Sequence, residues 1–302
     1  MKPAIKAHIG LLFTNLFFAI NLSAVKYLTG NMLVKPFGLN VIRVGVSVIL
    51  FWLMFVMAPG KTQKIERKDW GRFFWCALAG IAINQLLFLK GLSLTYSIHA
   101  GLLMLTTPIL ITIIAAWILK EKINSFKIIG LFLGIAGATI LIAGREKTGN
   151  GNDVLLGDCF ILINAISYTG YFILVKPLMQ RYPPIQVMRM IFTIGFFMVL
   201  PFGYQEFVSI PWQQYDSIAY QCLVLIVIGG TFLAYLFNIY GIQHLGAAKA
   251  GSYIYSQPVF ATIIAMTFLH ESLSWTKIIA AVFIFNGVYL CNYNRSAQID
   301  KS

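Results

Sequence analysis

The sequence predicts an all-α polytopic membrane protein with ten transmembrane helices arranged as two inverted five-helix repeats. Three observations predict this fold: an apolar composition, ten long apolar runs, and a similarity between the two halves of the chain. Hydrophobic residues make up 59% and charged residues 11% of the 302 residues, whereas a soluble protein has roughly 45–50% and about 25%. Because so few charges cannot cover a water-exposed surface, the composition excludes a soluble enzyme and a nucleic-acid-binding module.

The apolar runs are long enough to cross a bilayer, which takes about 20 mostly apolar residues in a helix. The predicted spans are 8–28, 37–58, 72–90, 97–119, 126–144, 155–177, 185–205, 217–240, 247–269 and 275–293. The polar breaks between them are short, so no soluble domain is expected. The predicted organisation is a first five-helix repeat over 1–146, a second over 153–295, and a short cytoplasmic tail over 296–302.

The basic residues predict the orientation, because cytoplasmic loops carry an excess of Lys and Arg. With the N-terminus inside, fifteen of the 23 basic residues lie on the cytoplasmic side, six lie on the other side, and two lie within spans. This distribution predicts a multi-pass protein of the bacterial cytoplasmic (inner) membrane with both termini in the cytoplasm. The formal net charge of +13 is therefore a topology signal, and the expected surroundings are lipid, with no nucleic acid.

The two halves match when the chain is shifted against itself by 150 residues. Fourteen identities fall within residues 91–140, and the run Thr112–Ala115 recurs as Thr262–Ala265. Each half holds five predicted spans, and an odd number inserts the second half in the opposite orientation. Inverted repeats are typical of transporters, in which they build two alternating states. We therefore expect alternating access.

Several short motifs occur in order along the first half, and the last part of the series is repeated in the second half. The first-half motifs are Ala24-Val25-Lys26, Pro36, Arg43, Ala100-Gly101, Pro108, Leu119-Lys120-Glu121-Lys122, Lys127 and Gly130. The second half repeats the segment that begins at Ala100 with Ala250-Gly251, Pro258, His270-Glu271 and Lys277. With these residues, nearly the whole chain resembles the EamA-type branch of the drug/metabolite transporter (DMT) superfamily. The resemblance implies a metabolite transporter, with export as the expected direction. The family is chemically diverse, so the resemblance supplies no substrate.

Ionisable groups inside the hydrocarbon core are functional candidates because they are costly there. All ten acidic residues lie in loops or at span ends, and Asp158 is the deepest. Without a midplane carboxylate or histidine, the sequence favours facilitated diffusion or exchange over Asp-based proton coupling, although coupling through another group stays open. The four cysteines are far apart and form no Cys/His cluster, so we expect no metal and no cofactor.

The two basic residues inside spans are Arg43 and Arg189, each roughly 8–9 Å along its helix from the span end at 1.5 Å per residue. Two interpretations stay open. They reach back to the nearby headgroups, or they guard opposite ends of one cavity and attract a carboxylate.

Proline and polar residues predict where the substrate pathway runs. Pro108 and Pro258 are expected to kink the fourth and ninth spans, either for packing alone or to expose backbone toward a cavity. Besides the two arginines, the predicted pathway residues are Asn21, Asn84, Gln85, Thr107, Asn164, Tyr168, Tyr171, Tyr235, Asn238, Tyr255 and Gln257. Hydrogen bonding between helices is the alternative role for such residues.

The fifth and tenth spans carry little charge, and Gly130-x-x-x-Gly134 gives the fifth a small-residue packing face. We expect these two spans to be scaffold or to form a homodimer.

The predicted function is that of a secondary transporter that moves a small polar or amphipathic metabolite, such as an amino acid, outward by alternating access. Two alternatives remain: an exchanger or facilitator for organic anions or nucleotide-like compounds, and a non-transporting sensor or assembly subunit. An enzyme is not expected, because the chain has no His-Glu-x-x-His, no paired midplane aspartates and no Gly-x-Ser-x-Gly.

Overall fold

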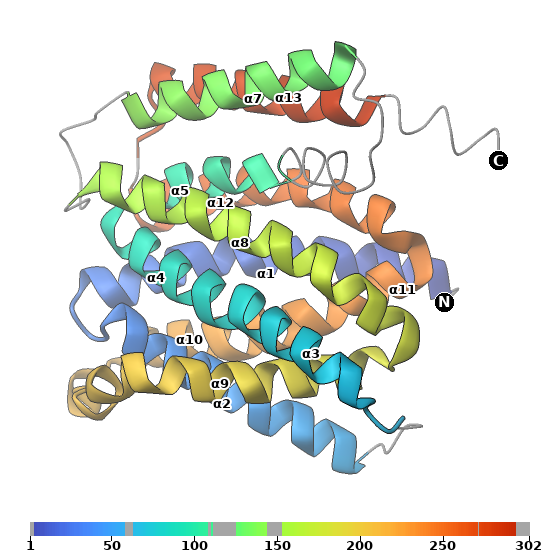
Figure 1. The fold of residues 1–302 in the computed structure, drawn as a ribbon. Helices are drawn as coiled ribbons and strands as arrows, with labels where there is room; N and C mark the ends of the chain where they lie inside the picture. Colours follow the sequence, from blue (N-terminus) through green and yellow to red (C-terminus); the bar gives the residue numbers. More distant parts are fainter. Residues whose placement is uncertain are drawn as a thin grey trace.

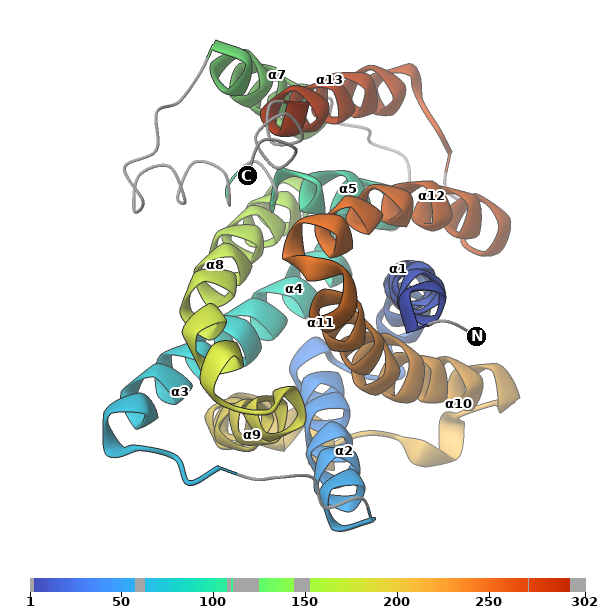
Figure 2. The ribbon, with the colours of Figure 1, turned by 90° about the vertical axis from the view of Figure 1, so that its right-hand side faces the viewer.

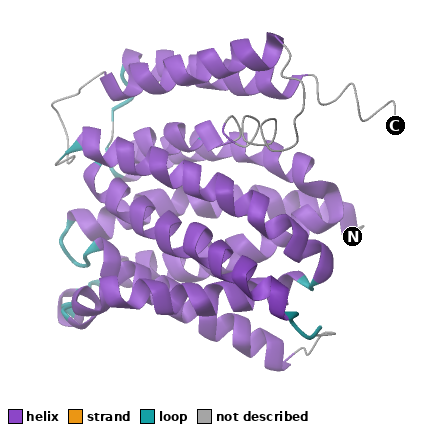
Figure 3. Ribbon diagram, in the orientation of Figure 1, coloured by secondary structure: helices purple, strands orange, loops and turns teal. Residues whose placement is uncertain are grey.

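The computed structural model describes residues 3–57, 63–107, 110, 125–143, 153–270 and 272–293. Every regular element in these ranges is helical (Figure 3), so the all-α prediction is confirmed. In the first half the elements are α1 (Pro3–Gly30), α2 (Pro36–Met57), η1 (Arg67–Asp69), α3 (Trp70–Ala77), η2 (Leu78–Ile83), α4 (Asn84–Leu94), α5 (Ser97–Met104) and α7 (Ser125–Ala143).

The second half has a closely related order. Its elements are α8 (Val154–Arg181), α9 (Pro184–Val208), η3 (Trp212–Gln214), α10 (Ser217–Val224), η4 (Leu225–Leu233), α11 (Ala234–Ser252), η5 (Tyr253–Ser256), α12 (Gln257–Phe268) and α13 (Trp275–Tyr293). Aspartate side chains cap the start of two helices. The Asp153 carboxylate accepts from the Leu156 amide at the start of α8, and Asp216 accepts from the Ala219 amide at the start of α10.

Within the described ranges, six helices are long and apolar enough to cross a membrane, which agrees with a multi-pass membrane protein. They are Ala4–Gly30, Pro36–Met57, Arg67–Leu94, Val154–Arg181, Pro184–Val208 and Ser217–Gly241. Shorter apolar helices cover Ile128–Ile140, Gln257–Phe268 and Trp275–Gly287. The count of ten spans stays a prediction, because much of the predicted fourth span lies outside the described residues.

The 150-residue offset recurs in the helix bounds. Helices α7 and α13 begin and end 150 residues apart, and α8 follows α1 at nearly the same offset. The third long helix of each half also contains a π-helical segment, η2 in the first and η4 in the second.

One predicted boundary is wrong. The sequence predicts a break between 240 and 247, but α11 runs through it. Gly241 is there for close packing, since a Cβ at this position would lie 2.5 Å from the Leu11 side chain of α1.

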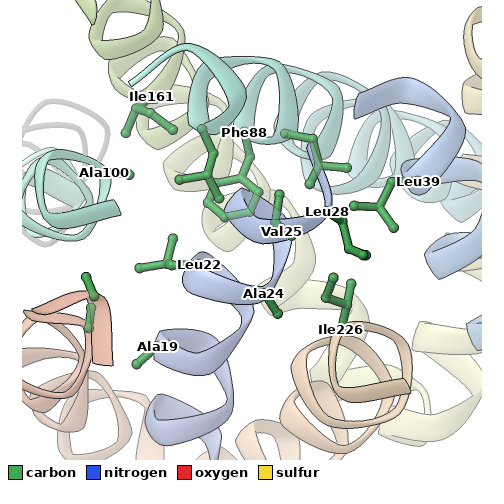
Figure 4. Close-up of a cluster of buried hydrophobic side chains, with 14 of the residues drawn as sticks. Ala19, Leu22, Ala24, Val25, Leu28, Leu39, Phe88, Ala100, Ile161 and Ile226 are labelled. Atoms are coloured by element: carbon green, nitrogen blue, oxygen red, sulfur yellow. The ribbon is translucent and has the colours of Figure 1, made fainter. Parts of the chain in front are cut away.

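The helices pack as pairs drawn from the two halves. Helix α2 lies beside α9 and α7 lies beside α13 (Figure 1), while α4 packs on α8. Helix α1 packs against α11 and α12 and lies among them in Figure 2. Its Leu22, Val25 and Leu28 join Phe88 and Ile226 in a buried apolar cluster (Figure 4). This cluster packs α1 against helices of both halves, where its polar side chains can border a cavity.

Within the chain, the small-residue face of α7 is filled by α13. A Cβ on Gly287 would lie 2.6 Å from the Gly130 carbonyl oxygen and from the Gly134 amide nitrogen. The scaffold role expected for these two helices fits this contact. A homodimer through them stays a prediction and would use the opposite faces, where Phe132 and Ile279 are exposed.

Candidate functional site

A cavity of about 100 Å³ lies among the helices, halfway along α1. At roughly 10–15 Å³ per water molecule, it has room for several waters or a small ligand. Residues from both halves line it: Thr14, Asn15, Phe18, Asn21, Arg43, Asn84, Gln85, Phe88, Met104, Thr107, Asn164, Tyr168, Tyr235, Asn238, Ile254 and Gln257.

Arg43 is the cation of this cavity. Its side chain is only 4% exposed, and its Nε donates to the Thr231 hydroxyl at 3.1 Å. The π-helical turn of η4 orients that hydroxyl, which donates in turn to the Ile226 carbonyl five residues earlier at 2.9 Å. Arg43 Nη1 is buried and has no hydrogen-bond partner among the described residues. A charged donor is therefore left available beside the cavity.

Two amide oxygens of α1 are also buried without partners in the described chain. Asn15 Nδ2 donates to the Leu11 carbonyl at 2.8 Å, which leaves Oδ1 unpaired, and the Oδ1 of Asn21 is unpaired as well. Asn21 lies against Gly230 of η4, where a Cβ would come within 2.7 Å of its own Cβ. Buried acceptors without donors are costly, so a ligand with N–H or O–H groups would be stabilised here.

Aromatic rings form the apolar part of the wall. The ring of Phe18 meets that of Tyr235 edge to face at 6.2 Å, and the Arg43 guanidinium carbon lies 6.0 Å from the centre of the Phe88 ring. Among the residues that the structure describes, no Asp or Glu lines the cavity, and the charged lining group is the Arg43 guanidinium.

Asn84 and Asn164 hold two walls together. Asn164 Nδ2 donates to the Asn84 carbonyl at 2.7 Å, and Asn84 Nδ2 points back to the Asn164 carbonyl at 3.5 Å. These reciprocal bonds join α4 to α8. Their side chains therefore serve both roles considered for them, the link between helices and the lining of the cavity.

The structure brings ten of the predicted pathway residues to this cavity and leaves Tyr171 and Arg189 outside it. Tyr171 is buried against Gly80 of η2, and its hydroxyl lies 3.8 Å from the Met188 sulfur. The side chain of Tyr255, and Pro108 as a whole, lie outside what the structure describes. Pro258 lies in the first turn of α12, directly after η5, so the chain changes helix type there instead of bending one continuous α-helix.

Arg189 lies between α9 and α2. Its guanidinium carbon is 3.7 Å from the centre of the Phe55 ring and 4.4 Å from that of Trp52. The side chain is 7% exposed, and its Nε and Nη1 have no partner in the described part of the chain. Stacking on two aromatic faces favours a cation. Whether Arg189 takes part in transport stays a prediction.

Sequence reasoning missed six lining residues: Thr14, Asn15, Phe18, Phe88, Met104 and Ile254. Helical spacing could have found some of them. Thr14, Phe18 and Asn21 follow an i, i+4, i+7 pattern and so share one face of α1. Phe88 lies one turn after Asn84 on α4. Helical spacing therefore identifies the lining face, whereas polarity alone does not select its apolar members Phe18 and Phe88.

No group of three or more His, Cys, Asp or Glu side chains that could hold a metal ion occurs among the described residues. The cavity chemistry is that of one guanidinium, several amides and hydroxyls, and aromatic rings. Such a set binds small molecules by hydrogen bonds, charge and stacking.

The chain is similar to known transporters over almost its full length. It is 22% identical to an uncharacterized transporter of Archaeoglobus fulgidus, over 94% of this chain and 96% of the relative, and 24% identical to one of Clostridium kluyveri, over 97% and 94%. A solved crystal structure at 18% identity superposes with a TM-score of 0.62 over 94% of this chain and 95% of the other, which shows the fold alone. The model of the EamA-like transporter family matches residues 5–143 and 155–293. This chain therefore belongs to the EamA-like transporter family and is a membrane transporter of the drug/metabolite type.

Proposed function

We propose that the cavity binds a small metabolite carrying a carboxylate, such as an amino acid or a related compound, and that the protein exports it across the bacterial cytoplasmic membrane by alternating access. The observation that carries this proposal is the buried Arg43, whose Nη1 has no partner among the described residues and lies beside a cavity that none of their acids lines. A carboxylate would neutralise the guanidinium and accept a hydrogen bond from its Nη1. The unpaired oxygens of Asn15 and Asn21 would accept from the amino group.

A difference between the two halves supports alternating access. Gly230 packs on Asn21, and at the 150-residue offset Gly80 packs on Tyr171. Asn21 lines the cavity, while Tyr171 fills the corresponding place in the other half and lies outside it. Two related sites, one open to the cavity and one filled by an aromatic side chain, favour a transporter whose halves open in turn.

The proposal is tested by counterflow in liposomes that contain the purified full-length protein. The labelled probes are L-threonine, L-phenylalanine and L-glutamate, with phenethylamine as the analogue of phenylalanine that lacks the carboxylate. We expect exchange of at least one amino acid and none of phenethylamine.

Variants connect the flux to the site. Arg43→Gln removes charge-assisted hydrogen bonds worth roughly 1.5–3 kcal/mol, so half-saturation should shift roughly ten- to a hundredfold. Arg43→Lys keeps the charge and should retain part of the binding. Arg67→Gln removes an exposed charge in η1 and is the matched control. Equal flux in Arg43→Gln and the control would refute the role of Arg43.

Other outcomes separate the alternatives. If organic anions or nucleotides are exchanged and no amino acid is transported, the alternative of an organic-anion or nucleotide exchanger is favoured. Absence of flux for every compound tested would favour a sensor or assembly subunit. Cysteine labelling at each terminus in intact and opened cells would test the cytoplasmic placement of both ends.

A further inference from the structure

A second polar cluster lies away from the cavity, where α4 turns into α5. It contains a buried acid and a buried histidine: Asp158 is 0% exposed and His99 is 2% exposed. His99 Nδ1 lies 3.1 Å from Asp158 Oδ2, and the Thr95 hydroxyl donates to Asp158 Oδ1 at 2.5 Å. Both titratable groups are near span ends in the sequence, but packing seals them from solvent.

The turn beside this pair is held from the other side as well. Lys26 of α1 donates its Nζ to the Thr95 carbonyl at 2.7 Å and reaches the carbonyls of Ser93 and Leu92 at 3.4 and 3.5 Å. Thr95 is therefore bound through its carbonyl to a cation on α1 and through its hydroxyl to a carboxylate on α8. The α4–α5 turn is fastened to two neighbouring helices by charged groups.

Close backbone contact closes this end of the molecule. A Cβ on Gly157 would lie 2.8 Å from the Gly91 carbonyl oxygen and 2.8 Å from the Thr95 amide nitrogen. Because no side chain fits between α8 and the end of α4, the pair stays covered as long as these backbones remain in contact.

The same three helices that carry this cluster also carry cavity residues. Along α8, Asp158 is six residues from Asn164, and along α5, His99 is five residues from Met104. On α1, Lys26 is five residues from Asn21. At 1.5 Å per residue these separations are about 7.5–9 Å. Parting of the turn from α8 would therefore move walls of the cavity.

We propose that His99 and Asp158 form a proton-binding site that couples one proton to the opening and closing of this end of the transporter. An ionised carboxylate only accepts hydrogen bonds, so Nδ1 carries a hydrogen in either state of the ring and the added proton binds the lone pair of Nε2. No other bond forms or breaks. The site exists independently of the substrate, and only its use in transport depends on the proposed function.

The charge of the pair gives the direction of the coupling. With the proton bound, the imidazolium and the carboxylate form a buried ion pair with no net charge. Loss of the proton leaves a buried carboxylate without a compensating charge on its partner, which is strongly unfavourable in a closed site. The proton-bound pair therefore favours the closed state, in which the two buried charges compensate each other.

Other charged groups lie on the elements that pack around the pair. At this end of the molecule, α1 brings Lys26, α4 brings Lys90, and α13 brings Lys277, whose Nζ lies 5.0 Å from the centre of the Tyr96 ring. The Tyr96 ring meets the His99 ring at 5.3 Å. Helix α7 carries Lys127, and α12 carries no titratable residue. Among these groups, His99 is the one in direct contact with the buried carboxylate.

Hydrogen exchange of the full-length protein in lipid nanodiscs, without substrate, tests the proposal. The measured quantity is the protection of the amides of residues 91–99 at pH 6 and pH 8, corrected for the intrinsic exchange rate. In the unmodified protein, protection should fall about tenfold or more between pH 6 and pH 8, as expected when a charge-assisted hydrogen bond is weakened.

Three variants make the result decisive. His99→Gln keeps an N–H that can reach Asp158 but takes up no proton, so its protection should be the same at both pH values. Asp158→Asn removes the carboxylate, and its protection should be low at both. Asp153→Asn removes an exposed carboxylate one turn earlier in the chain and should behave like the unmodified protein.

Equal protection at pH 6 and pH 8 in the unmodified protein would overturn the proposal, and so would an unchanged pH response in His99→Gln. If Asp158→Asn does not fold, the comparison with His99→Gln still decides. If the hydrogen-exchange results are as expected but no amino acid is transported, the proposed substrate is refuted and the proton-binding site still stands.

Discussion

Replacing Gly287 by Ala tests how closely α7 and α13 pack. The new Cβ would lie 2.6 Å from the Gly130 carbonyl oxygen and 2.6 Å from the Gly134 amide nitrogen, and real Cβ atoms essentially never come within 3.0 Å of another heavy atom. Both atoms belong to the backbone, so no change of rotamer relieves the clash. The two helices must therefore move apart.

Two opposing effects set the expected magnitude. Alanine stabilises a helix interior by roughly 0.5–1 kcal/mol relative to glycine, while overpacking costs about 1–3 kcal/mol. Because the contact is with backbone, we expect the overpacking to prevail, with a net loss of about 1–2 kcal/mol. Gly170→Ala in α8 is the matched control. No heavy atom of the described residues lies within 4 Å of its added Cβ, so it should stabilise the protein by roughly 0.5–1 kcal/mol.

The assay is reversible unfolding of the reconstituted protein in mixed micelles with increasing SDS, followed by circular dichroism. The two substitutions make the same chemical change and should shift the free energy of unfolding in opposite directions. If both raised it equally, the close α7–α13 contact would be refuted.

Three other substitutions probe separate regions. Arg189→Ala should reduce counterflow while the protein remains folded. Unchanged flux would show that the guanidinium only packs on the two aromatic rings and has no part in transport. Tyr182→Phe removes a hydroxyl that donates to Asp69 at 2.8 Å and accepts from the Glu66 amide at 3.1 Å; the free energy of unfolding should fall by about 1–3 kcal/mol, and no change would show that water replaces the hydroxyl. Asn164→Leu breaks the bond to the Asn84 carbonyl at 2.7 Å and should lower both stability and flux, while a loss of stability alone would assign the residue to packing.

Much of the fold follows from hydrophobic run length and from the 150-residue repeat. The helices over 36–57, 184–208 and 275–293 lie close to their predicted spans because polar residues bracket each apolar run. The boundary near Gly241 failed because glycine in a membrane helix serves close packing as well as chain breaks. Run length alone does not separate the two uses.

The cavity was predicted in part, since polar residues inside apolar helices tend to face the interior. The sequence gives Arg43 and Arg189 the same expected role, because both arginines look alike in one dimension, whereas the structure brings Arg43 and not Arg189 to the cavity. Only the packing of Trp52 and Phe55 onto Arg189 distinguishes them.

The contact between His99 and Asp158 joins residues 59 positions apart. A periodic sequence pattern predicts neighbours on one helix and does not predict such a pair.

The π-helical turns give both halves of the chain the same interruption of a long helix. A π-turn takes one residue more than an α-helical turn, so the helix is wider where it occurs. Here η2 and η4 occupy corresponding places in the two halves, with Gly80 and Gly230 at the same offset. In the second half the wide turn lets the Thr231 hydroxyl donate to the Ile226 carbonyl while it accepts from Arg43 Nε. A change of this turn to regular α-helix would therefore move the group that holds the cavity's guanidinium.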